Sequence, residues 1–222
     1  LSIVTTDYRP VGPHEWDAQG QGVFSLVEVY RFTSDRSWLR QVYPAIRKAC
    51  QFLEKIRQQR LTDEYRNAKP PKRCCFGILP PSVSAEDLGP GSWHHYWDDF
   101  WAIRAWRDLE YAARELGIEA DVKWAREQGD ALLEATMQSI RCTMRYFGID
   151  YVPNGPEDKS SSSMARGTSP ALWPGMVLDP DSELMRRSFD VYWQKWIAPT
   201  GGGYLHHGSI SVSYTHLTLP TN

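Results

Sequence analysis

The amino-acid sequence predicts an all-α fold made of antiparallel helical hairpins. Apolar residues recur at intervals of three and four over long stretches, and no stretch sustains the alternation of a β-strand. Helices with one polar face alternate along the chain with helices that are apolar on more than one face. Tight turns likewise alternate with long loops rich in Pro, Gly and Ser. Together these observations predict inner and outer helices in turn.

The first predicted hairpin joins an inner helix over residues 19–32 to an outer helix over 39–56. The inner helix has few polar positions and carries small residues such as Gly20, which is typical of a helix packed on several sides. In the outer helix, charged residues fall between the apolar ones and form a solvated face. Pro44 is expected to begin the main part of this helix, because Pro is tolerated in a first turn.

The second predicted hairpin joins an inner helix over residues 96–116 to an outer helix over 120–147, with Gly148 as its C-cap. A third hairpin is expected to begin near Glu183. The turns at 33–35 and 117–119 are short, which predicts antiparallel neighbours.

The return connections, over residues 61–95 and 148–182, are long. Because each hairpin goes up and back, all the long loops are expected at one end, together with the starts of the inner helices. Long loops inside a compact domain usually carry function. The acidic residues expected at this end are Glu15, Asp17, Asp98, Asp99, Glu157 and Asp158.

The composition fits one soluble globular domain. The chain has 222 residues, of which 41% are hydrophobic and 23% charged, with a net charge of −2. This balance argues against a nucleic-acid or anionic-membrane partner, and no run approaches the roughly 20 apolar residues of a membrane span. The chain opens with Leu1 rather than Met, so the lack of a signal peptide predicts no compartment.

Cysteine usage predicts neither a metal site nor a redox compartment. Cys50 and Cys142 occupy apolar helical positions and are expected to be small core residues. The adjacent pair Cys74 and Cys75 has no second pair at zinc-ligand spacing.

Two motifs place acids among aromatic residues at the start of an inner helix. Residues 94–101 set Asp98 and Asp99 between rings, and residues 14–17 set Glu15 and Asp17 around Trp16. Aromatic faces stack on sugar rings, and carboxylates perform acid/base work on a glycosidic oxygen. The alternative interpretation is that the aspartates cap the free N–H groups of their helices.

These features resemble the six-hairpin, (α/α)6-barrel glycosidases of the glucoamylase-like type. The motifs at residues 14–21, 77–82 and 96–101 carry the resemblance, which covers residues 1 to about 208. The family implies a toroid of six inner and six outer helices with a sugar cleft at one end, of which this chain holds about two and a half hairpins. We therefore expect a partial toroid over residues 1–210, whereas 211–222 resemble a translated sequencing adapter.

The resemblance implies hydrolysis of the glycosidic bonds of an oligo- or polysaccharide by a pair of carboxyl groups, without a cofactor or a metal. Asp98, Asp99 and Glu157 are the predicted catalytic residues. The positive potential at a helix start is expected to lower an aspartate pKa, which suits a base. Glu157, in a Gly-Pro-acidic loop like that of phosphorylase-like members, is the expected acid. The predicted substrate-binding residues are Glu15, Trp16, Asp17, His95, Tyr96, Trp97, Arg166 and Trp173.

Two other functions remain open at this point. A sugar epimerase on the same toroid would shuttle protons through histidines, so His95→Ala would abolish it and Glu157→Gln would not. A non-catalytic carbohydrate-binding module would lose affinity when Trp16 or Trp97 is replaced, and would be insensitive to changes of its carboxylates. Fold analogy alone does not choose among the three.

Overall fold

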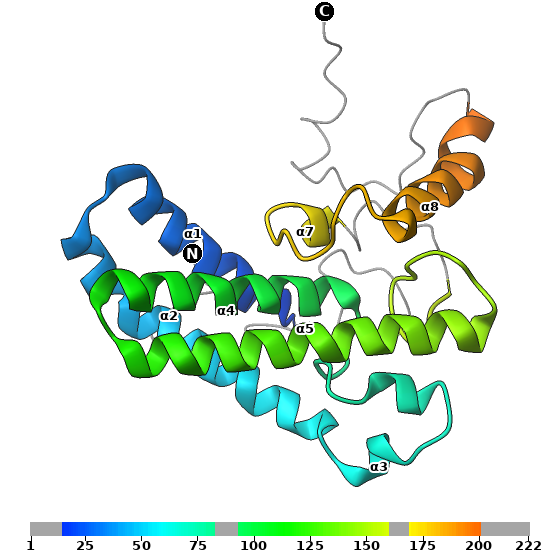
Figure 1. Cartoon of the computed structure of the whole chain (residues 1–222), viewed down its shortest axis with the longest axis horizontal. Helices are drawn as coiled ribbons and strands as arrows, with labels where there is room; N and C mark the ends of the chain where they lie inside the picture. Colours follow the sequence, from blue (N-terminus) through cyan, green and yellow to red (C-terminus); the bar gives the residue numbers. More distant parts are fainter. Residues whose placement is uncertain (1–14, 83–92, 160–168, 201–222) are drawn as a thin grey trace, which may run out of the picture.

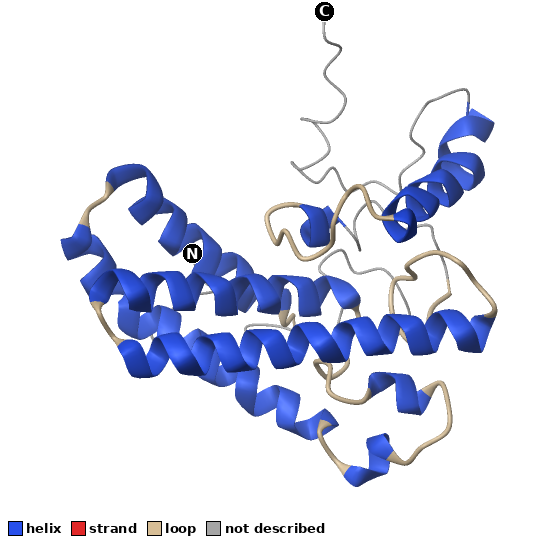
Figure 2. Cartoon of the chain, viewed as in Figure 1, coloured by secondary structure: helices blue, strands red, loops and turns tan. Residues whose placement is uncertain are grey.

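The computed structural model describes residues 15–82, 93–159 and 169–200. Within these ranges the regular structure is helical, apart from two isolated β-bridges, Ser82 to Trp93 and Gly155 to Asp158. Figure 2 shows helices joined by loops throughout this part of the chain. The predicted all-α class is therefore confirmed.

Four long helices form two hairpins. The first consists of α1 (Asp17–Thr33) and α2 (Arg36–Arg57), and the second of α4 (Tyr96–Leu116) and α5 (Glu119–Phe147). Helix α4 contacts all three of the others, and α1 also packs on α2 (Figure 1). Helix α4 is therefore central among the four, which explains why it is apolar on several sides.

Shorter elements connect and follow the hairpins. They are η2 (Gln58–Arg60), α3 (Asp63–Arg66), η3 (Lys72–Cys75), α7 (Ser169–Leu172), α8 (Glu183–Tyr192), the π-helical turn η4 (Trp193–Ile197) and η5 (Ala198–Thr200). Helix α8 begins at Glu183, where the third hairpin was expected. Ser182 caps it by accepting a hydrogen bond from the backbone N–H of Met185.

The helix boundaries agree with the sequence except at Pro44. Gly117 and Gly148 end α4 and α5 with φ of 76° and 65°, a left-handed conformation that glycine adopts without steric cost. Pro44 lies inside α2, so the prediction that it begins the main part of the helix is wrong. The start is set instead by Asp35, whose carboxylate accepts hydrogen bonds from the N–H groups of Ser37 and Trp38.

Helices α1 and α4 start at the same end of the hairpins and run in the same direction (Figure 1). We call this the loop end, and the opposite end, where the tight turns join each hairpin, the turn end. The two backbones approach closely at Gly20, where a Cβ atom would lie 2.4 Å from the carbonyl oxygen of Trp101. Only glycine fits this contact, which fixes the distance between the two helices.

One of the two cysteines that were predicted to be small core residues forms a disulfide bond instead. Cys50 is buried and free, as expected, but Cys142 forms a disulfide bond with Cys74. The bond joins η3 to α5 across 68 residues of sequence, a separation at which local spacing gives no signal. No helix in the described ranges is long and apolar enough to cross a membrane.

Candidate functional site

Three aspartates are buried together at the loop end of α1 and α4. Asp17, Asp98 and Asp99 are 2%, 3% and 1% exposed. Asp17 Oδ2 accepts hydrogen bonds of 2.8 Å from the indole of Trp97 and of 2.8 Å from the amide of Gln21. The first of these contacts links the two predicted motifs directly.

Asp98 and Asp99 hold the segment that precedes their own helix. The carboxyl group of Asp98 forms a hydrogen bond with the hydroxyl of Ser82. Asp99 Oδ1 accepts a hydrogen bond of 2.9 Å from the backbone N–H of Leu79, while its Oδ2 is buried without a hydrogen-bond partner. The N-cap residue of α4 is His95, so the interpretation of these aspartates as helix caps is wrong.

The pKa values of Asp98 and Asp99 are raised, whereas the sequence predicted that they are lowered. Burial raises the pKa of Asp99 to about 8 and outweighs its hydrogen bond from Leu79 and the charge of Arg57. Burial, followed by the neighbouring charge of Asp17, raises the pKa of Asp98 well above its usual value. The prediction that the helix start lowers these pKa values is therefore wrong. Removal of a carboxylate from water destabilises its charged form more than the positive potential of the helix start stabilises it.

Two of the predicted sugar-binding aromatic residues belong to the core. Tyr96 is fully buried, and its hydroxyl forms hydrogen bonds with Ser139 and Thr143 of α5. Trp16 is 7% exposed, packs against the ring of Phe52 and donates its indole N–H to the carbonyl of Pro80 at 3.0 Å. These contacts give both side chains a packing role and leave little surface for a sugar.

The other predicted residues of the two motifs lie nearer the surface. Glu15 is exposed just before α1, and His95 and Trp97 are half-buried. Burial lowers the pKa of His95, which favours the neutral imidazole. The ring of Trp97 meets that of Trp101 edge to face, with centroids 6.1 Å apart.

The predicted acidic loop docks against the start of α4. The carbonyl of Asn154 accepts a 3.0 Å hydrogen bond from the backbone N–H of Tyr96. Gly155 approaches the same segment so closely that a Cβ atom would lie 1.9 Å from the carbonyl oxygen of His94. Glycine is therefore required at this turn, and the docking carries Glu157 to the loop end.

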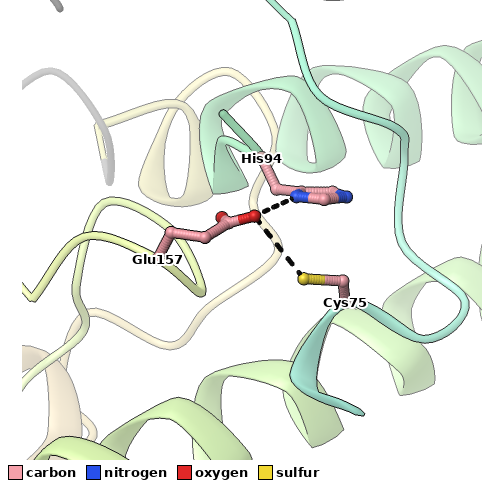
Figure 3. A group of neighbouring side chains, drawn as sticks. All are labelled: Cys75, His94 and Glu157. Carbon is pink, nitrogen blue, oxygen red and sulfur yellow. Dashed lines mark hydrogen bonds and ion pairs between the residues drawn. The ribbon is translucent and has the colours of Figure 1, made fainter. Parts of the chain in front are cut away.

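Glu157 is an exposed carboxylate fixed by a buried histidine. The Nδ1 atom of His94 lies 2.6 Å from Glu157 Oε1 (Figure 3). The Nε2 atom of His94 accepts a 3.0 Å hydrogen bond from the guanidinium of Arg60. Burial opposes ionisation of Glu157, but the hydrogen bond from His94 outweighs it and lowers the pKa of the carboxyl group. A carboxyl group with a lowered pKa is a poor general acid and a suitable base or nucleophile.

Cys75 completes a group of three side chains. Its Sγ lies 3.7 Å from Glu157 Oε1, and the sulfur, the imidazole nitrogen and the carboxylate oxygen all lie within 4.8 Å of one another. Figure 3 shows the three side chains pointing toward a common centre from η3, from the segment before α4 and from the acidic loop. These three atoms are possible metal ligands, although no metal was predicted from the sequence.

Trp173 lies on a separate loop and is 66% exposed. Arg104 of α4 donates to the carbonyl of Pro174, and Arg107 donates to the carbonyls of Gly175 and Met176 at 2.8 and 2.9 Å. The two arginines thus fix the loop against α4 and leave the indole open to solvent. Arg166, the remaining predicted residue, lies outside the described residues.

Four residues at this end were not predicted as site residues from the sequence: Arg57, Arg60, Cys75 and Ser82. Arg57 is 6% exposed and donates to the carbonyls of Gly77 and Ala131, and its charge acts on Asp99. Arg57 and Arg60 follow an amphipathic helix and look like solvated residues there. A buried arginine at the end of α2 leaves no periodic signal, so sequence alone could not identify it.

Comparisons with profiles of protein families, with curated proteins and with solved structures find no significant match.

Proposed function

We propose that this chain is part of a six-hairpin toroid that hydrolyses glycosidic bonds of an oligo- or polysaccharide, with Glu157 as its catalytic carboxylate. The observation that supports this most strongly is the docking of the acidic loop on the start of α4. It brings an exposed carboxylate, held by His94, to the end where α1 and α4 both begin. An exposed carboxylate in a fixed position is one of the two groups that glycoside hydrolysis requires.

Glu157 acts as base or nucleophile in this proposal, not as the acid expected from the sequence. Its pKa is lowered by His94 against the effect of burial, so the carboxylate is ionised at neutral pH. An ionised carboxylate activates water in an inverting enzyme, or attacks the anomeric carbon in a retaining one, and in both cases a second, protonated carboxyl group must donate a proton to the leaving oxygen.

Asp17, Asp98 and Asp99 act as positioning residues in this proposal. All are at least 97% buried, and their described contacts are with the protein itself. Asp98 and Asp99 hold the segment 79–82, and Asp17 orients the indole of Trp97. Trp97 and Trp173 are the described aromatic residues best exposed for stacking on sugar rings among those predicted.

The test is hydrolysis of a panel of α- and β-linked oligosaccharides, followed by chromatography of the released sugars. We expect turnover by the wild-type chain and a loss of at least about 100-fold in Glu157→Gln, the size of a general acid–base contribution. The matched control is Glu64→Gln, an exposed glutamate on α3 that pairs with Lys72 and is expected to leave turnover unchanged. Turnover that survives in Glu157→Gln contradicts the assignment.

The same panel separates the two other functions. An epimerase would interconvert free sugars without hydrolysis, and His95→Ala would abolish that activity while Glu157→Gln would not. A binding module would change its tryptophan fluorescence with sugar, lose this response in Trp97→Ala, and release no product. Either outcome would replace the hydrolase proposal.

A further inference from the structure

Cys75, His94 and Glu157 form a group whose ligand atoms come from three separate segments. The backbone holds each of them independently: Cys75 ends η3, His94 precedes the N-cap of α4, and Glu157 lies in the turn bridged between Gly155 and Asp158. Cys75 and His94 are 2% and 5% exposed, while Glu157 is exposed. The group therefore has two buried members and one exposed member.

We propose that this group binds a zinc ion. One thiolate sulfur, one imidazole nitrogen and one carboxylate oxygen form a mixed donor set, which suits Zn²⁺ and not the all-oxygen preference of Mg²⁺ or Ca²⁺. Three protein ligands leave the fourth position of a tetrahedral ion for water or another small molecule, as in catalytic zinc sites.

The present spacing is close to what the ion requires. Bonds of about 2.0–2.3 Å in a tetrahedron place ligand atoms about 3.3–3.5 Å apart. The sulfur lies 3.7 Å from Glu157 Oε1, so this pair fits almost unchanged. The 2.6 Å contact between His94 Nδ1 and the same oxygen must lengthen by less than about 1 Å, because the ion takes the place of the shared proton.

Binding also rearranges protons in a defined way. Arg60 donates to Nε2 of His94, so Nδ1 carries the proton of the neutral ring in the metal-free protein. When Nδ1 binds Zn²⁺, its proton is replaced by one on Nε2, and Arg60 turns away from the ring. The thiol of Cys75 loses one proton to solvent, so one proton is released for each ion bound.

The proposal is independent of the proposed hydrolase function, because metal binding is measured directly. If both hold, Zn²⁺ occupies the carboxylate of Glu157 and inhibits hydrolysis. If only the zinc proposal holds, the metal binds and no sugar is turned over. Failure of the zinc proposal, seen as no metal binding, is therefore distinguishable from failure of the hydrolase proposal, seen as no sugar turnover.

The experiment is a titration of the whole chain with Co²⁺, followed by competition with Zn²⁺, with the disulfide left intact. We expect one equivalent of Co²⁺ to produce the near-ultraviolet charge-transfer band of a cobalt–thiolate bond, and Zn²⁺ to abolish it. This band reports sulfur ligation, so binding to other histidines of the chain does not contribute. A spectrum without the band, at saturating Co²⁺, overturns the proposal.

Two cysteine variants form a matched pair. Cys75→Ala is expected to remove the band and to weaken Zn²⁺ binding by more than the roughly 10–100-fold that loss of an outer-shell partner costs. Cys50→Ala, at the other buried free thiol, is expected to keep the charge-transfer band and the Zn²⁺ affinity, because Cys50 contacts the carbonyl of Ala105 away from this group. Circular dichroism checks that both variants fold. Equal Zn²⁺ affinity in the two variants overturns the proposal.

Glu157→Gln and His94→Gln test the other two ligands without removing sulfur. Each is expected to lower the Zn²⁺ affinity measured by calorimetry, since a neutral amide is a poor ligand for this ion. Affinity unchanged from wild type in both variants contradicts the three-ligand site.

Discussion

The two ends of the α1–α4 pair treat buried acids in opposite ways. At the turn end, Asp108 is fully buried and lies between two arginines, with contacts of 2.6 Å to Arg31 and 2.8 Å to Arg104. At the loop end, Asp17 and Asp99 each have one carboxylate oxygen buried without a hydrogen-bond partner. The same residue type at the same depth is thus neutralised at one end and left incompletely paired at the other.

The starts of α1 and α4 at the loop end also lack side-chain caps, since their N-cap residues are Trp16 and His95. At the turn end Asp35 caps α2, whereas Ile118 before α5 provides no side-chain cap. Incomplete pairing and missing caps lower stability. Proteins usually retain such features where they serve a site, which agrees with our location of the site at the loop end.

The largest expected effect comes from breaking the turn end. Asp108→Ala leaves Arg31 and Arg104 without their shared carboxylate, and loss of one partner of a buried pair costs about 3–5 kcal/mol. Urea denaturation measures this change, and the lower part of the range is expected because Arg31 is partly exposed. Glu64→Ala, which removes an exposed ion pair with Lys72, is the control and is expected to change little. Equal changes in the free energy of unfolding in Asp108→Ala and Glu64→Ala would contradict the view that the ion pairs of Asp108 stabilise the turn end.

Asp99→Asn is expected to stabilise the loop end in a pH-dependent way. Because the folded-state pKa of Asp99 is raised to about 8, the stability that its neutral form contributes is present at low pH and is lost as pH rises from about 4 through 8. An amide stays neutral and still accepts from Leu79, so the variant should exceed wild type by about a few kcal/mol at pH 9. Thermal unfolding at pH 3 and pH 9 measures this.

The control for this prediction is internal to the pH series. At pH 3 Asp99 is protonated in both the folded and the unfolded chain, so it is nearly equivalent to an asparagine and the two proteins should unfold at similar temperatures. A difference of the same size at both pH values would mean that the charge of Asp99 is not its cause.

Gly20→Ala is expected to separate α1 from α4 near the loop end. The added Cβ would lie 2.4 Å from the carbonyl oxygen of Trp101, and such overpacking costs about 1–3 kcal/mol, which exceeds the gain in helix propensity. Gly129→Ala on α5 is the matched control, because its Cβ would meet the side chain of Trp106 at 3.1 Å, where the neighbour has only to yield slightly. Chemical denaturation should rank Gly20→Ala as the less stable variant.

The smallest expected effect concerns the caps. Asp35→Ala removes two hydrogen bonds to the start of α2 and should cost about 1 kcal/mol. His95→Ala removes no cap from α4 and should change the free energy of unfolding less than Asp35→Ala does. The reverse order, measured by urea denaturation, would contradict the assignment of Asp35 as a cap and of His95 as a residue that provides none.

The helices were predictable from the sequence because each signal is local. Gly117 and Gly148 end α4 and α5 where expected, and the apolar character of α4 on several sides correctly predicted a central helix. The gathering of Asp17, Trp97 and Asp98 at one end followed from the hairpin topology. Each of these inferences needed only spacing within one helix or the up-and-down order of the helices.

The chemistry of the site was less predictable because it depends on contacts between distant segments. The pKa of Asp99 follows from burial that the helix pattern does not encode, and Trp16 was predicted to bind substrate although it packs on Phe52. The pairing of His94 with Glu157 joins residues 63 apart in sequence. Such pairings arise when loops fold back on the helices, and no local rule predicts them.

Arg104 connects the turn-end ion pairs to the loop that carries Trp173. Its Nε contacts Asp108, while another nitrogen of the same guanidinium donates to the carbonyl of Pro174. The planar guanidinium of Arg104 therefore contacts both Asp108 and the loop of Trp173, so a shift of the loop changes the hydrogen bond to Asp108, and the reverse also holds. A sugar bound at Trp173, as proposed above, would therefore be thermodynamically linked to the packing of α1 on α4, and its affinity would report on the stability of that helix pair.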